Sequence, residues 1–136
     1  MGRILAIDYG RRRTGLAVTD PAQIIPGGLT TVATGELLKF LDDYMKRETV
    51  DRVVVGWPTQ TNGEPSENQR RVAEFVRAFE RRHPGVPVVR QDERFTSVIA
   101  HRTMIDAGLS RKRRQDKALV DEISATLILQ QYMDGR

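Results

Sequence analysis

The stretch ILAIDYG, at residues 4–10, runs from apolar side chains into a carboxylate, Asp8, and then into Gly10. A short apolar run that ends at a turn signal is typical of a buried strand. Residues 14–20 have the same character, and GRRR at residues 10–13 joins the two stretches. We therefore expect an antiparallel hairpin with Asp8 at the end of its first strand. A carboxylate in that place is costly to bury unless it is paired or holds a metal.

The remainder of the chain alternates between strand and helix patterns. Further strands are predicted at residues 29–32, 50–57 and 86–91. Helices are predicted at residues 34–48, 67–83, 96–107 and 117–133, with N-caps at Thr34, Ser66, Thr96 or Ser97, and Asp116. The strand that follows Pro26 is expected at a sheet edge. The unbroken apolar run of the fourth strand suits a central position covered on both faces.

These elements predict an α/β fold in a single domain over residues 1–136. Its mixed five-stranded sheet would have three antiparallel strands first and helices on both faces. Its length is enough for one hydrophobic core. The sequence has no cysteine, which excludes a disulfide framework and a thiolate metal site. The two histidines, His83 and His101, lie far apart in the sequence, so a zinc enzyme is not expected.

Charge is concentrated in two places. Residues 11–13 and 111–114 together carry seven positive charges, so the rest of a chain with net charge +4 carries −3. Two basic runs on a slightly acidic body indicate a surface for a polyanion such as nucleic acid. No apolar run approaches the length of a membrane span, and the N-terminus lacks a signal-peptide pattern. We expect a cytoplasmic protein that does not associate with membranes.

Three carboxylates stand out by position: Asp8, Glu93 after the fifth strand, and Asp121 near the start of the last helix. Asp121 is in line with Ala125 and Ile128 on the apolar stripe of that helix. Three oxygen donors of this kind suit Mg²⁺ or Mn²⁺, and two such ions can clamp a phosphodiester and activate water.

Each carboxylate also has a simpler interpretation. Glu93 can pair with Arg94, Asp121 can pair with Lys117, and Asp8 can cap a turn. The residues alone leave both interpretations open.

The chain resembles the YqgF family along nearly its whole length. The motifs that carry the resemblance are Asp8-x-Gly10 with Arg13-x-Gly15, Val55-Gly56-Trp57-Pro58, Asn62-Gly63, Asp92-Glu93-Arg94-Phe95-Thr96-Ser97 and Val120-Asp121-Glu122-Ile123-Ser124-Ala125. The departures are mild: Phe95 replaces a more usual leucine, and the pair of small residues after the last aspartate is Ser124-Ala125.

The resemblance implies an RNase H-like fold and a metal-dependent acidic site at Asp8, Glu93 and Asp121, with one or two Mg²⁺ or Mn²⁺ ions. It implies a nuclease that matures the 5′ end of the small-subunit (16S) rRNA precursor, or a Holliday junction resolvase that acts on branched DNA. Ribosomal precursor particles are expected partners, and the chain is expected to act as a monomer or weak homodimer. The residues expected to contact nucleic acid are Arg11, Arg12, Arg13, Arg94, Arg111, Lys112, Arg113 and Arg114.

Two other functions remain open from the sequence. An ATP-using enzyme of the actin and sugar-kinase type shares a hairpin with Asp-x-Gly, but such enzymes need two domains of this kind. A non-catalytic RNA-binding protein of ribosome assembly or transcription would not need three carboxylates. Arg13 can contact phosphate or hold a site carboxylate, and Trp57 can stack on a base or belong to the core. Gly10 and Gly15 are interpreted as backbone requirements, through a positive φ or a close approach.

Overall fold

The computed structural model describes residues 2–58, 67–92, 108 and 116–136. A five-stranded sheet with the order β3-β2-β1-β4-β5 lies at its centre. Its strands are β1 (Arg3–Asp8), β2 (Arg13–Thr19), β3 (Pro26–Ala33), β4 (Val50–Trp57) and β5 (Val88–Asp92). The described helices are the 3₁₀ turn η1 (Thr34–Glu36), α1 (Leu37–Arg47), α2 (Glu67–Arg82) and α5 (Lys117–Asp134).

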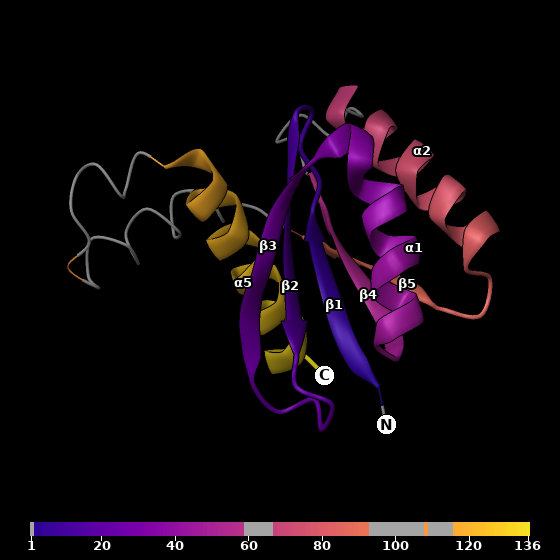
Figure 1. Cartoon of the computed structure of the whole chain (residues 1–136). Coiled ribbons are helices and arrows are strands. Elements are labelled where there is room, and N and C mark those ends of the chain that lie inside the picture. The colour runs from indigo at the N-terminus through magenta and orange to yellow at the C-terminus, as the bar shows by residue number, and fades with distance from the viewer. Residues whose placement is uncertain (1, 59–66, 93–107, 109–115) are drawn as a thin grey trace.

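The pairing of the strands confirms the predicted mixed sheet. β1 pairs with β2, and β2 with β3, in antiparallel fashion, whereas β1, β4 and β5 are parallel. Because the carboxyl ends of parallel strands meet at one margin of a sheet, the ends of β1, β4 and β5 share that margin (Figure 1). Asp8 lies there, opposite Gly15 of the neighbouring strand.

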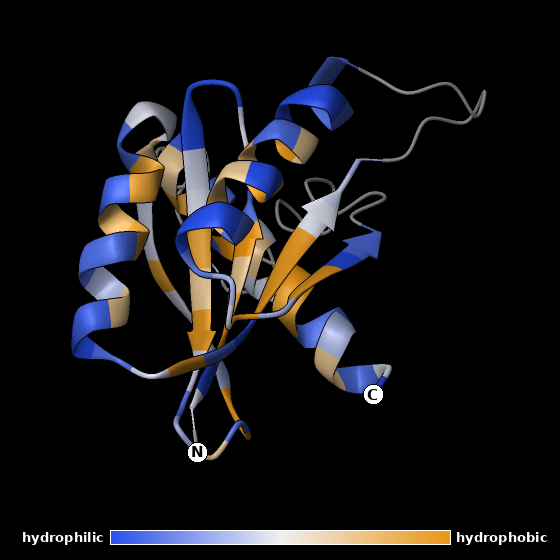
Figure 2. Ribbon diagram, turned by 90° about the vertical axis from the view of Figure 1, so that its right-hand side faces the viewer, coloured by the Kyte–Doolittle hydropathy of each residue, from blue (hydrophilic) through white to orange (hydrophobic). Residues whose placement is uncertain are grey.

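Helices cover both faces of the sheet, as predicted. α1 and α2 lie on one side and α5 on the other (Figure 1). The larger core forms under α1 and α2, where Leu5, Ile7 and Phe79 are fully buried. The smaller core forms under α5, between Ile4 and Ala6 of β1 and residues such as Ile128. Figure 2 shows the apolar colouring concentrated on the strands and on the inner faces of the helices.

β4 has the central position that its apolar run predicts. Val53 and Val55 pack into the core under α1 and α2, while Val54 packs into the core under α5. A strand covered on both faces gains from apolar side chains at every position, which explains the absence of alternation.

Three element boundaries differ from the sequence prediction by two residues or more, and one of them is the start of β5, at Val88 rather than Val86. β3 starts at Pro26 rather than at Leu29, because a proline is tolerated at the first position of an edge strand. Its register shifts between the pairs Leu16–Thr30 and Ala17–Gly28, so Leu29 is an extra residue in a bulge. The bulge interrupts the alternation on which a strand prediction depends.

Thr34 does not cap α1 as predicted. It begins η1, and its hydroxyl donates to the Gly10 carbonyl at 2.6 Å and lies 2.9 Å from the Thr14 hydroxyl. The side chain therefore ties the start of the helical segment to the hairpin. Asp116, by contrast, caps α5 as predicted, since its carboxylate accepts from the backbone amides of Ala118 and Leu119. Ser66 and the predicted helix at residues 96–107 lie outside the described residues.

The loop between β2 and β3 contacts residues near both ends of the chain. Gln23 has a left-handed backbone with φ 59°, which is uncommon for a residue with a side chain. The Gln23 Nε2 donates to the Gly2 carbonyl at 2.7 Å, and Nη2 of Arg136 donates to the backbone carbonyl of Gln23 at 2.7 Å. Asp20 stiffens the loop because its Oδ1 accepts from the backbone amides of residues 24 and 25.

Within residues 2–58, 67–92, 108 and 116–136, the structure contains no helix with both the length and the apolar character needed to cross a membrane.

Candidate functional site

Asp8 lies at the carboxyl end of β1, on the side of the sheet that faces α5. Ile4 and Ala6, four and two positions earlier on the same strand, pack into the core under α5, and side chains two apart on a strand share a face. Asp8 itself is half-buried. The strand thus presents a carboxylate at the point where the apolar cover of α5 ends.

Asp121 reaches the same margin from the other end of the chain. The apolar stripe of α5 buries Ala125 and Ile128 against the sheet, which sets the orientation of the helix. Its backbone touches β2 at Gly15, where an added Cβ would lie 2.0 Å from the Asp121 carbonyl oxygen. Because Gly15 is also the partner of Asp8, this glycine joins the elements that carry the two carboxylates.

Gly10 and Gly15 both serve a close approach rather than a positive φ. At Gly10 a Cβ would lie 2.2 Å from the Arg13 carbonyl oxygen, so the turn of the hairpin closes tightly on itself. Among the residues the structure describes, the only glycine with a positive φ is Gly108.

Arg13 pairs with Asp121. Its Nε donates to Oδ2 of Asp121 at 2.9 Å, across 108 positions of sequence. The two side chains keep 40% and 24% of their exposed surface, so water reaches the pair. The sequence left open whether Arg13 binds phosphate or a carboxylate, and whether Lys117 pairs with Asp121. In the structure, the carboxylate of Asp121 pairs with Arg13.

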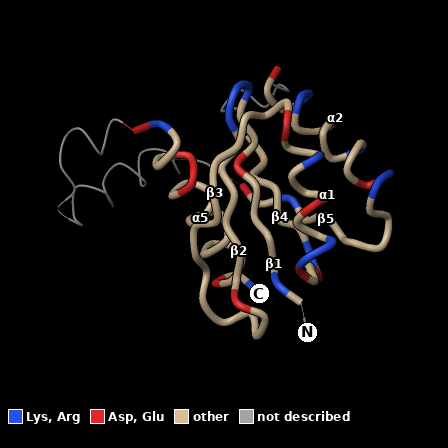
Figure 3. The backbone as a smooth tube through the Cα atoms, in the orientation of Figure 1, with Lys and Arg blue, Asp and Glu red and all other residues tan. Residues whose placement is uncertain are grey.

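A pocket of about 310 Å³ opens beside this ion pair. It is lined by Gly10, Arg11, Arg12, Arg13, Lys117 and Asp121. Arg11 and Arg12 are exposed at the tip of the hairpin, where Figure 3 shows a cluster of basic residues at the top of the molecule. The pocket therefore combines one carboxylate with several cations, a composition suited to an anionic ligand.

Lys117 is a residue of this pocket that the sequence suggested only as an ion-pair partner of Asp121, not as a binding residue. It is the first residue of α5, and its position beside the hairpin depends on how that helix docks. A lysine directly after the N-cap Asp116 resembles any exposed residue of a first helical turn, so the sequence contains no signal for this role.

Several predicted site residues lie outside the described part of the chain. These are Glu93, Arg94, Arg111, Lys112, Arg113 and Arg114. His101 also lies outside the described part. Among the described residues, no three His, Cys, Asp or Glu side chains form a group that could hold a metal ion. Two of the three proposed metal ligands, Asp8 and Asp121, are in the described part.

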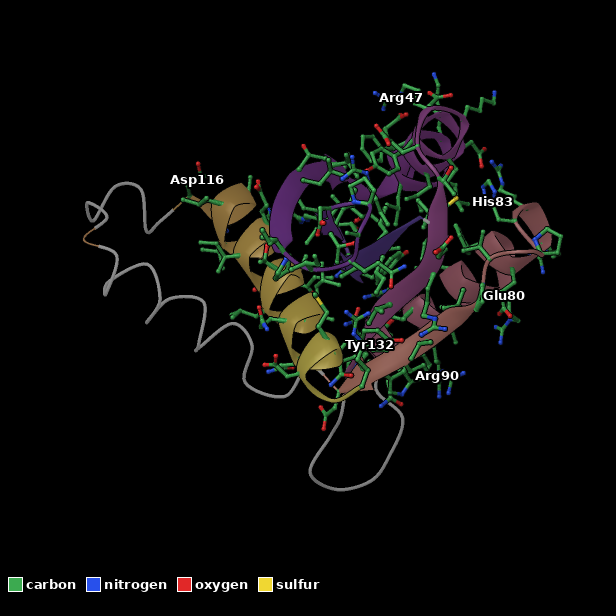
Figure 4. The ribbon with its side chains drawn as sticks, turned by 90° about the horizontal axis from the view of Figure 1, so that it is seen from below. Arg47, Glu80, His83, Arg90, Asp116 and Tyr132 are labelled. Atoms are coloured by element: carbon green, nitrogen blue, oxygen red, sulfur yellow. The ribbon has the colours of Figure 1, made fainter. Side chains whose placement is uncertain are left out.

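Trp57 lies at the end of β4, on the side of the sheet that faces α1 and α2. Its ring is partly buried against the larger core. The guanidinium of Arg90, which is exposed on β5, lies over the ring at 3.9 Å from the centroid (Figure 4 labels Arg90). This cation–π contact and the core packing support the interpretation of Trp57 as partly core, because Arg90 occupies a face that a base would use.

Tyr9 also points away from the carboxylates. Its ring stacks on Phe75 of α2, with 5.3 Å between centroids. Burial raises the pKa of the Tyr9 hydroxyl, and the positive charge of Arg71 opposes that rise in part. The phenol stays protonated at neutral pH and has the environment of a packing residue rather than of a proton donor at the site.

Comparison with known proteins gives consistent matches over the whole chain. The model of a family named RuvX, described as Holliday junction resolvase, matches residues 2–135. A protein of Bacteroides fragilis named "Putative pre-16S rRNA nuclease" is 60% identical over 136 residues, which are 100% of this chain and 99% of the relative. A protein of the same name from Bacteroides thetaiotaomicron is 57% identical with the same coverage.

Among solved structures, the fold is similar to that of Thermus thermophilus RuvC in complex with a Holliday junction substrate. The TM-score is 0.57 at 17% sequence identity, and the match covers 98% of this chain and 96% of RuvC. A second structure of the same protein matches with a TM-score of 0.56. At this identity the likeness establishes the fold, and it confirms the predicted sheet with its helices.

Proposed function

Because the chain belongs to the RuvX family, for which YqgF is another name, we propose that it is a metal-dependent nuclease of precursor ribosomal RNA. Nuclease activity agrees with the family and with the names of the relatives. The observation that carries the proposal is the contact of Gly15 with the Asp121 backbone, opposite Asp8. It brings carboxylates from the two ends of the chain to one margin of the sheet, beside a basic pocket.

The donor set fits a divalent cation. Asp8 and Asp121 offer carboxylate oxygens, the ligands that Mg²⁺ and Mn²⁺ prefer, and Asp121 already binds a cationic group, the Arg13 guanidinium. We propose Glu93 as the third ligand because it directly follows Asp92, the last residue of β5. A bound ion would supply an activated water and stabilise the charge on the phosphate that is attacked.

The chain's own residues would bind and orient the substrate. Arg11, Arg12 and Lys117 line the pocket and can neutralise phosphates next to the one that is cleaved. Arg94 and the basic run at 111–114 are proposed as further phosphate contacts, since they lie near Glu93 and before α5 in the sequence. We further propose that the protein acts in the cytoplasm on ribosomal precursor particles, as a monomer or weak homodimer.

Branched DNA is the second candidate substrate. It is favoured by the description of the family and by the fold shared with RuvC. Both substrates require the same carboxylates, so the choice between them depends on the shape of the nucleic acid that the basic surface accepts.

The test is a cleavage assay on precursor 16S rRNA and on a four-way DNA junction, with Mg²⁺, Mn²⁺ or EDTA. We expect wild type to cut the RNA with either metal and to be inactive in EDTA. Asp8→Asn should abolish cleavage and leave binding equal or tighter, because the amide removes a negative charge that repels phosphate. Asp43→Asn, at an exposed position of α1, is the matched control and should cut at the wild-type rate.

Three outcomes would contradict the proposal. Cleavage of the junction alone would assign the protein to branched DNA. Cleavage in EDTA would exclude the metal mechanism. Tight RNA binding by wild type without cleavage under any condition would favour the non-catalytic assembly factor.

A further inference from the structure

The ion pair of Arg13 with Asp121 raises a question of competition, because a cation already occupies one oxygen of a proposed metal ligand. Nε of Arg13 is 2.9 Å from Oδ2 of Asp121. Both side chains remain partly exposed, at 40% and 24%. An exposed pair of this kind contributes little to stability and can exchange partners readily.

The backbone position of Arg13 in the sheet keeps its side chain next to Asp121. It is the first residue of β2 and pairs with Ala33 of β3, so its backbone is fixed in the sheet and only the side chain can move. Asp8 and Asp121 are carboxylates on elements that Gly15 joins. The guanidinium gives one of these two carboxylates a positive partner.

A divalent ion attracts a carboxylate more strongly than the guanidinium does. At equal distance its interaction with a carboxylate is about twice that of a single positive charge. Arginine keeps its charge at every physiological pH, so deprotonation does not remove it from the site. A metal that binds Oδ2 of Asp121 must therefore displace it.

We propose that Arg13 is a positioning residue that holds Asp121 as an internal counter-ion and is exchanged for the divalent cation when the metal binds. The proposal rests on the nuclease function proposed above. The exchange frees a guanidinium at the wall of the pocket that Arg11, Arg12 and Lys117 also line. Metal binding thus increases the positive charge that faces the pocket.

Two measurements on the full-length protein test this proposal without cleavage. The first follows the Arg13 Nε–H signal by ¹H–¹⁵N NMR during titration with Mg²⁺ alone, with assignment by its loss in Arg13→Gln. We expect the signal to shift as Mg²⁺ saturates the site, because its acceptor is withdrawn.

The second measurement is Mn²⁺ binding by calorimetry for wild type, Arg13→Gln and Arg11→Gln. The Arg11 variant removes the same charge from the same pocket but leaves the ion pair intact. If the competing pair is worth the usual amount for an exposed contact, Arg13→Gln should bind Mn²⁺ about two- to fivefold tighter than Arg11→Gln. Arg13→Lys keeps a competing charge and should bring the affinity back toward wild type.

The outcomes separate this proposal from the nuclease itself. An enzyme that cuts with Mg²⁺ while the Arg13 signal stays unchanged overturns the exchange and leaves the nuclease intact. A shifted signal without cleavage of either substrate supports the exchange and contradicts the nuclease. Equal Mn²⁺ affinity in the two glutamine variants, or no metal binding at all, overturns the exchange.

Discussion

Gly15 is the residue on which the arrangement of the site depends most directly. A Cβ at this position would lie 2.0 Å from the Asp121 carbonyl oxygen and 2.4 Å from its carbonyl carbon. Since both are backbone atoms, α5 itself would have to move. We expect Gly15→Ala to destabilise the fold by about 1–3 kcal/mol through overpacking. The cleavage rate should fall by more than the loss of folded protein explains, because Asp121 moves with the helix.

Chemical denaturation and the cleavage assay measure these two effects. Gly27→Ala is the matched control, because a Cβ on this glycine of β3 meets nothing within 4 Å. Its stability should stay within about 0.5 kcal/mol of wild type. Full activity and stability in Gly15→Ala would show that α5 tolerates a shift. The close approach of α5 to β2 would then not be required for cleavage.

At the residue scale, local patterns predict the elements that carry Asp8 and Asp121, but not the partner of Asp121. The strand end of Asp8 and the apolar stripe of Asp121 are local patterns, which can be read from neighbouring residues. The ion pair with Arg13 depends on how α5 crosses β2, over 108 positions of sequence. Lys117 was an equal candidate by helical spacing, and only the docked helix decides between them.

At the scale of elements, Asp42 joins α1 to the end of α2. Its Oδ1 lies 2.8 Å from His83 Nε2, and its Oδ2 pairs with Arg82. Figure 4 shows His83 at the end of α2 that lies beside α1. Burial alone would raise the pKa of Asp42, but the hydrogen bond with His83 and the charges of Arg82 and His83 bring it below its ordinary value of 3.8.

We expect Asp42→Asn to lower the free energy of unfolding at pH 7 by about 0.2–1 kcal/mol. A folded-state pKa below the unfolded value stabilises the protein above the unfolded pKa, and that stability is lost as pH falls through the folded value. The difference between wild type and variant should therefore narrow only below pH 3.8. Denaturation curves across this range, with Asp43→Asn as the exposed neighbour, measure it. A difference that is constant down to the lowest pH would show that the carboxylate charge is not responsible.

Two of the boundaries that differ from the sequence prediction also belong to this scale. A residue such as Thr34 is a common N-cap, yet here its hydroxyl contacts Gly10 and Thr14, which are distant in sequence. The bulge at Leu29 has the same origin, since it arises from pairing with β2. Tertiary contacts decide both cases, whereas Asp116 caps its own helix and could be predicted locally.

At the scale of the whole molecule, charge is expected to govern substrate binding. Changing Arg11 and Arg12 to Gln should lower the salt slope of log K for single-stranded RNA by about 1.4, at about 0.7 per phosphate contact. The affinity should fall for all sequences alike. Changing the exposed Arg77 and Arg81 of α2, on the other side of the sheet, removes the same charge and should leave the slope unchanged. Equal slopes in the two double variants would exclude the hairpin tip from the binding surface.

The contacts of Gln23 have a consequence for how the chain can be reconnected. Its side chain binds Gly2, and its backbone carbonyl binds Arg136, so the first and last described residues lie close together at the end of the sheet away from the hairpin tip (Figure 1). A short linker between them would close the backbone into a ring, and a new opening before Asp116 would give a circular permutant that begins with α5. In such a chain α5 would directly precede β1. The helix and the hairpin, now encoded at opposite ends of the gene, would be synthesised as neighbours.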